Sequence, residues 1–67
     1  MIQYAILYQD KEHGYYGFKR LDHEGETYSF GERYKAFAYA GEKGWRLVDV
    51  IDNRAYTQYY FQRKVKS

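Results

Sequence analysis

The chain has 67 residues and a mass of 8.2 kDa, which suffices for one domain with one small core. It has no cysteine and two histidines, so disulfides and thiolate metal sites cannot stabilise it, and we expect no metal and no cofactor. Hydrophobic residues make up 45% and charged residues 30%, which indicates a folded domain. A net charge of +2 neither requires nor excludes an anionic partner. No apolar run approaches the ~20 residues that span a bilayer and no signal-peptide pattern is present, so we expect one cytoplasmic domain over residues 1–67 without membrane contact.

Two extended segments are predicted in the first third of the chain. Residues 2–9 alternate between two sets of side chains, as a strand does. Residues 10–14 are polar and end in glycine, which predicts a turn. Residues 15–22 form a second probable strand, whose aromatic residues on both sides leave its facing open. Residues 23–26 are a further polar, glycine-containing break.

One helix is predicted after this break. Ser29 and Glu32 have the spacing of a capping box, in which each side chain bonds the other residue's backbone amide. Gly44 is expected to take the left-handed conformation that closes the helix. Helical spacing between them predicts one buried stripe. The residues of this stripe are Phe30, Tyr34, Phe37, Ala38 and Gly41.

The last third predicts a hairpin, with strands over residues 45–51 and 56–65 and a turn at residues 52–55. The expected fold class is therefore α+β: a small antiparallel sheet of about four strands, in the order β-β-α-β-β, with one helix packed on one face. We expect Trp45 to anchor the core, although a ligand platform is its alternative role. The other core candidates are Phe30, Phe37, Phe61, Val48 and Val50.

The C-terminal half resembles a known family. Residues 41–48 read Gly-Glu-Lys-Gly-Trp-Arg-Leu-Val, and residues 59–63 read Tyr-Tyr-Phe-Gln-Arg. These segments are similar to short bacterial and phage proteins of unknown function, marked by a helix ending in Gly-x-x-Gly-Trp and a closing Tyr-x-Phe-x-Arg strand. Residues 13–19 resemble that family's glycine-aromatic segment before the helix. The resemblance implies a small sheet-plus-helix fold and carries no catalytic residues; the Phe-Gly pair at 30–31 and the alanine-rich helix depart from the family's usual leucine-rich helix.

Two loops, residues 10–14 and 22–26, each place a histidine among carboxylates, as in metal or acid-base sites. A hairpin of the two predicted strands would hold these loops about 25 Å apart. We therefore interpret them as solvated turns, with a site between subunits as the remaining alternative. Nucleophile motifs and glycine-rich phosphate loops are absent, and one helix on a small sheet encloses little volume, so we expect no enzymatic activity.

The ten tyrosines are the main functional signal. One helix covers only one side of a sheet, so tyrosines on both sides of the strands cannot all be buried. A tyrosine suits a partly exposed surface because its ring is apolar and its hydroxyl tolerates water. Basic residues interleaved with them resemble the stacking-plus-charge sites that bind nucleotides. The predicted binding residues are Tyr15, Tyr16, Lys19, Arg20, Arg54, Tyr59, Tyr60 and Arg63. Cross-strand stabilisation and a solvated mixed-charge face are the alternatives.

The helix leaves two interpretations open. Ala36, Ala40 and Gly41 are small, and Tyr39 is expected on the side away from Phe30 and Phe37. Together these residues could form a contact between subunits. The alternative is a helix that sits closely on its own sheet.

The favoured hypothesis is a small non-enzymatic binding or inhibitory protein that associates with copies of itself. It would engage a host protein or a small anionic, nucleotide-like ligand, with arginine or lysine on phosphate and tyrosine on the base. By analogy with the family, a phage or mobile-element origin is part of this hypothesis. The alternative is a single-stranded nucleic-acid-binding module, whose affinity would fall steeply with salt. A third hypothesis is a metal-assisted hydrolase using His13 or His23.

Overall fold

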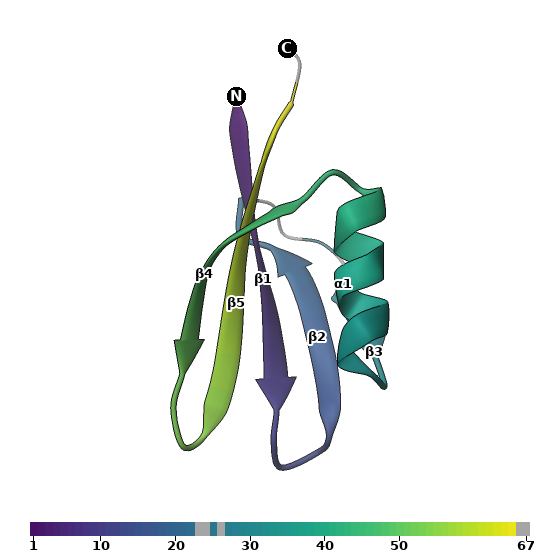
Figure 1. Ribbon diagram of the computed structural model, residues 1–67, viewed down its shortest axis with the longest axis vertical. Helices are drawn as coiled ribbons and strands as arrows, with labels where there is room; N and C mark the ends of the chain where they lie inside the picture. Colours follow the sequence, from purple (N-terminus) through teal and green to yellow (C-terminus); the bar gives the residue numbers. More distant parts are fainter. Residues whose placement is uncertain (23–24, 26, 66–67) are drawn as a thin grey trace.

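The computed structural model describes residues 1–22, 25 and 27–65, and within them one helix packs on a five-stranded antiparallel sheet (Figure 1). The sheet order is β3-β2-β1-β5-β4. This confirms the α+β class. The predicted β-β-α-β-β order is not matched, because a further short strand, β3, precedes the helix. The elements are β1 (Ile2–Asp10), β2 (Tyr15–Arg20), β3 (Tyr28–Phe30), α1 (Arg33–Glu42), β4 (Arg46–Asp52) and β5 (Tyr56–Lys64).

The first and last strands form the middle of the sheet. β1 and β5 pair along their full lengths, and both hairpin turns lie at the same end of the molecule (Figure 1). The Lys11 ammonium joins these turns, because it donates to the Asn53 carbonyl at 2.9 Å and lies 3.4 Å from an Asp52 carboxylate oxygen. Gly14 closes the β1–β2 turn with a φ of 73°, where a side chain would be strained.

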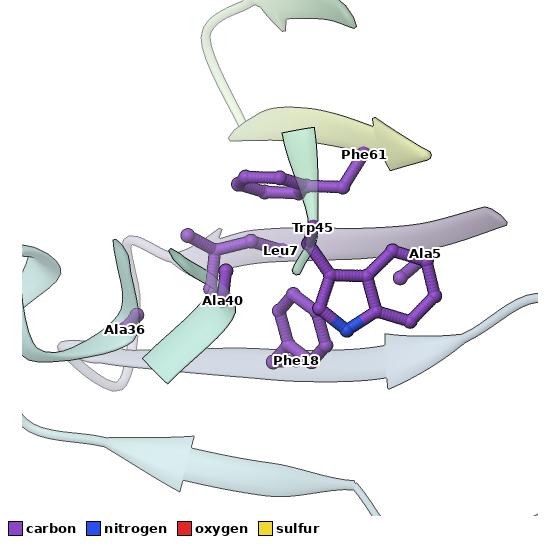
Figure 2. Packing of buried hydrophobic residues seen from close by; sticks show 7 residues of the cluster. All are labelled: Ala5, Leu7, Phe18, Ala36, Ala40, Trp45 and Phe61. Atoms are coloured by element: carbon purple, nitrogen blue, oxygen red, sulfur yellow. The ribbon is translucent and has the colours of Figure 1, made fainter. Parts of the chain in front are cut away.

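The core lies between α1 and one face of the sheet. Leu7 is opposite Phe18 on β2 and opposite Tyr59 on β5, so these side chains share the helix side. In Figure 2 the Trp45 indole lies beside Ala5 and Phe18, and its ring is 5.9 Å from the Phe18 ring. The core roles predicted for Trp45 and Phe61 are confirmed. The buried cluster consists of Ala5, Leu7, Phe18, Ala36, Ala40, Trp45 and Phe61.

The helix starts later than predicted. Ser29 and Phe30 belong to β3, where Phe30 pairs with Tyr16 of β2, and the N-cap of α1 is Glu32 without a side-chain hydrogen bond. The predicted capping box is therefore wrong, because Ser29 is paired with β2 in the sheet and does not cap the helix. The C-terminal prediction is confirmed: Gly44 has a φ of 83°, and the next amide, of Trp45, donates to the Ala40 carbonyl at 2.9 Å.

The later start rotates the buried stripe. Ala36 and Ala40 face the sheet and are buried, whereas Tyr34 is 67% exposed and Ala38 and Gly41 are exposed too. The stripe predicted from helical spacing is wrong in these three positions. The two small side chains seat α1 closely on its own sheet, which decides between the two interpretations of the helix.

Tyr39 is partly buried and packs against the core. Its ring lies 5.4 Å from the ring of Phe30 and 5.5 Å from that of Phe18. Phe37 packs on the other flank of the helix, 5.1 Å from the Tyr59 ring. The expectation that Tyr39 points away from Phe30 is therefore wrong. Both Phe30 and Phe37 are partly buried against the core, as predicted.

β4 lies at the edge of the sheet, beyond the reach of α1. The helix packs over β2 and β3, at the opposite side of the sheet (Figure 1). Val48 and Val50 are therefore 50% and 46% exposed, and their prediction as core residues is wrong. Leu47 and Ile51 are similarly exposed. A bulge between Leu47 and Asp49 interrupts the pairing of β4 with β5.

Candidate functional site

The eight predicted binding residues lie on different surfaces. Pairing register and contact with the core assign each strand residue to one face of the sheet. The helix side carries Tyr16, Arg20, Tyr59 and Arg63; the opposite face carries Tyr15, Lys19 and Tyr60; Arg54 lies in the exposed β4–β5 turn. The structure therefore does not bring all eight into one site, because successive residues of a strand point to opposite faces.

The face away from α1, here called the open face, is uncovered by any described element. Tyr4 and Tyr56 remain 47% and 41% exposed on it. Its rows follow from the register, in which Ile6 is opposite both Lys19 and Tyr60. The open face consists of Ile2, Tyr4, Ile6, Tyr8 and Asp10 of β1, Tyr15, Gly17 and Lys19 of β2, Ser29 of β3, Tyr56, Gln58, Tyr60, Gln62 and Lys64 of β5, and Arg46, Asp49 and Ile51 of β4.

The centre of the open face carries no charge. The cross-strand pairs there are Tyr4 with Gln62, Ile6 with Tyr60, and Tyr8 with Gln58. The Tyr60 hydroxyl donates to the Gln58 side-chain oxygen at 3.0 Å. The charged residues of this face lie on β2, next to the central pair, on the edge strand β4, and at the ends of β1 and β5. An uncharged, tyrosine-rich centre with a charged rim is the typical composition of a protein–protein interface.

Tyr8 lies across the sheet on Gly17, its partner on β2. A Cβ at residue 17 would lie 2.8 Å from Tyr8 Cε2, so only glycine leaves room for the ring in this position. The Tyr15 ring contacts Tyr8 edge-on, with centroids 6.5 Å apart, and the Lys19 ammonium lies 5.9 Å from the Tyr8 centroid. Burial raises the pKa of Tyr8, and Tyr15 raises it further. The phenol is therefore held neutral on this face.

The predicted binding residues did not include Tyr4, Tyr8 and Tyr56. The alternation in residues 2–9 already separated Tyr4 and Tyr8 from Leu7, but it did not show which set would face the helix. Contact of Leu7 with the helix side decides this, and it places all three tyrosines on the open face.

Three predicted residues border one hollow on the helix side. Lys19 and Arg20 of β2 and Arg63 of β5 line this hollow of about 440 Å³, which also borders Trp45. Tyr16 and Tyr59 lie against the core instead, away from this hollow. Tyr39 of α1 and Lys43, just after α1, also line it, although neither was among the predicted binding residues.

The histidine loops give no joint site in the described part of the chain. In the β1–β2 turn, His13 Nδ1 lies 2.7 Å from Asp10 Oδ2, and this hydrogen bond lowers the pKa of the Asp10 carboxyl. Asp10 also accepts the backbone amides of Glu12 and His13 at 3.1 Å. This pair therefore shapes the turn. His23 lies outside the described residues, so the predicted separation of the loops stays a prediction.

No family model, no curated protein and no solved structure matches this chain. The resemblance to short bacterial and phage proteins therefore stays a prediction. Among the described residues, no helix has both the length and the apolarity needed to cross a membrane.

Proposed function

We propose that this chain is a small non-enzymatic binding protein that works as an assembly of its own copies, joined through the open face. The uncharged centre of that face carries the proposal. Phosphate-binding surfaces place cations where they meet the backbone of the ligand, whereas here the exposed Tyr4 and the half-buried Tyr60 lie over the middle, where Ile6 is already buried. Partner recognition by such a surface relies on aromatic contact and not on charge.

The small size of the core favours a second copy of this chain as the partner that covers the open face. Of the eight buried hydrophobic residues in the described part of the chain, three are alanine, so the core buries little apolar volume. A domain of this size without disulfides or metal commonly gains stability from association. Packing two open faces against each other would add a second core on the unprotected side of each sheet.

The area of the open face agrees with this arrangement. Its central strands are nine residues long. Five strands at ~4.8 Å spacing and ~3.4 Å per residue give a face of about 20 by 30 Å, or roughly 600 Å² per copy. Two such faces bury about 1,200 Å², which is the lower limit of standard specific interfaces.

Association is tested by sedimentation velocity and native mass spectrometry across protein concentration. We expect a dimer at micromolar concentration. Tyr4→Glu places a charge at the centre of the open face and should weaken the dimer at least about tenfold. The matched control is Tyr34→Glu, which makes the same change on the exposed side of α1 and should leave the dimer unchanged.

Three results would contradict the proposal. The first is a wild-type monomer at millimolar concentration. The second is equal weakening by both variants. The third is tight binding of a single-stranded oligonucleotide that is lost in Tyr4→Glu and falls steeply with salt, because the open face would then be a stacking platform for nucleic acid.

A further inference from the structure

The hollow on the helix side collects cations and aromatic rings from four elements and the segment before β4. It lies at the C-terminal end of α1, and its volume of about 440 Å³ is within the range of small-molecule sites. Its main lining residues are Arg20, Tyr28, Tyr39, Lys43, Trp45 and Arg63. These residues face away from the open face, so association through that face leaves the hollow accessible.

Arg63 is the fixed point of the hollow. Its Nε donates to the Gln3 side-chain oxygen at 2.8 Å, and one terminal nitrogen donates to the Lys43 carbonyl at 2.7 Å. The guanidinium also stacks on Trp45, 4.1 Å from the ring centroid. A guanidinium has five N–H donors, and these two bonds use two of them. The group is therefore held in one orientation with donor capacity left for an anion.

Lys43 adds a second charge beside Arg63. Neither of these two side chains has a carboxylate partner among the described residues. Arg20, in contrast, forms a bidentate ion pair with Asp22: its Nε donates to Oδ1 at 3.2 Å and its Nη2 donates to Oδ2 at 2.9 Å. Within the described part of the chain, Lys43 and Arg63 are therefore the helix-side cations that can meet a ligand, whereas Arg20 is paired with Asp22.

The aromatic wall lies next to these cations. The Tyr28 and Tyr39 rings are 5.2 Å apart, and the Lys43 ammonium lies 5.8 Å from the Tyr39 centroid. Burial raises the pKa of Tyr39, Tyr28 raises it further, and Arg63 opposes them. The Tyr39 phenol therefore stays neutral, and the two tyrosines offer ring surfaces and hydroxyl groups to a planar ligand.

We infer that this hollow binds a mononucleotide, with the phosphate on Arg63 and Lys43 and the base against Tyr28 and Tyr39. Guanidinium and ammonium groups recognise phosphate by charge-assisted hydrogen bonds. Aromatic rings recognise the base by stacking, largely without regard to its identity. The inference rests on the proposed function only in taking the chain as a binding protein, and it does not depend on the dimer.

The test is a calorimetric titration with AMP and GMP, alongside adenosine, inorganic phosphate and a single-stranded oligonucleotide. Because Trp45 is the only tryptophan in the chain, its emission excited near 295 nm gives a second readout. We expect both mononucleotides to bind, and adenosine and phosphate alone to bind at least about tenfold more weakly. Lys43→Gln should reduce AMP affinity about tenfold and leave adenosine binding unchanged. The matched control is Lys35→Gln on α1, which removes an equal charge outside the hollow and should change nothing.

The inference is overturned if AMP and GMP give neither heat nor a change in emission at millimolar concentration. It is equally overturned if the two lysine variants lose affinity to the same extent, or if the oligonucleotide binds more tightly than AMP. Sedimentation of the same samples separates the two proposals. Loss of nucleotide binding with the dimer intact contradicts the ligand site alone, and nucleotide binding by a monomer contradicts the open-face assembly alone.

Discussion

Replacing Gly17 by alanine tests whether the Tyr8 ring is held against the sheet as described. A Cβ at this position would lie 2.5 Å from Tyr8 Oη and 2.8 Å from Cε2, far inside ordinary van der Waals contact. The ring must therefore leave its place on the open face. Tyr8 would lose packing, and its edge contact with Tyr15 would open.

Two opposing effects set the size of the change in stability. Overpacking of this kind typically costs about 1–3 kcal/mol. Alanine in place of a strand glycine returns roughly 0.5–1 kcal/mol, because the unfolded chain loses freedom. The difference between these two effects is about 0–2.5 kcal/mol, so we expect Gly17→Ala to lower the free energy of unfolding by about 1 kcal/mol, equivalent to a fall in Tm of roughly 4–8 °C.

Urea unfolding followed by circular dichroism measures this difference. Gly41→Ala is the control, because a Cβ there meets no atom within 4 Å and helix propensity should raise stability by up to about 1 kcal/mol. The double variant Tyr8→Ala/Gly17→Ala isolates the contact, since Gly17→Ala should no longer destabilise once the ring is gone. An equal loss of stability from Gly17→Ala with and without the Tyr8 ring would refute the reasoning.

The remaining predictions concern the core and pH. Leu7→Ala should cost about 3–5 kcal/mol because Leu7 is fully buried, whereas Leu47→Ala, at 47% exposure, should cost about 1 kcal/mol; urea unfolding of both variants compares them. The Thr57 hydroxyl donates to Asp52 at 2.7 Å and lowers the pKa of this carboxyl below its ordinary value of 3.8. The carboxylate therefore contributes stability above that pH, and this stability is lost as the pH falls. Asp52→Asn should flatten the acid side of a stability–pH curve, and an unchanged curve would contradict this. Burial raises the pKa of Tyr39 above 10.0, so the contribution of its neutral phenol is complete below that pH and lost as the pH rises; Tyr39→Phe should weaken the alkaline loss, measured by the same unfolding series.

The sequence predicted four of the five strands and the end of the helix, but not β3. Period-two alternation identified β1, and the Gly44-Trp45 step identified the helix end, because a left-handed glycine and a large apolar residue leave few alternatives. The start of the helix was wrong because Phe30 suits both a helical stripe and a strand. Its pairing with Tyr16 is a contact between distant residues, which local spacing does not contain.

The candidate surfaces were predicted in composition but not in arrangement. Tyrosine counts showed that one helix could not cover every ring, yet the face of each strand depends on where the helix packs. The hydrogen bond from Arg63 to the Lys43 carbonyl joins β5 to the end of α1, and these two residues are 20 positions apart in the sequence, so local spacing does not predict it. Val48 is likewise exposed because β4 is an edge strand of the sheet, and hydrophobicity alone does not reveal which strand lies at the edge.

The position of β5 beside β1, in the middle of the sheet, has a consequence for folding. The central ladder joins residues up to about sixty positions apart in the chain, and Gln3 and Arg63, which are 60 apart, also share a side-chain hydrogen bond. During translation, β1 can meet β2 early, but it must wait for residues 56–64 to leave the ribosome before its other edge is satisfied. A nascent chain lacking these residues would expose the unpaired edge of β1, which is the kind of surface that chaperones and neighbouring chains bind.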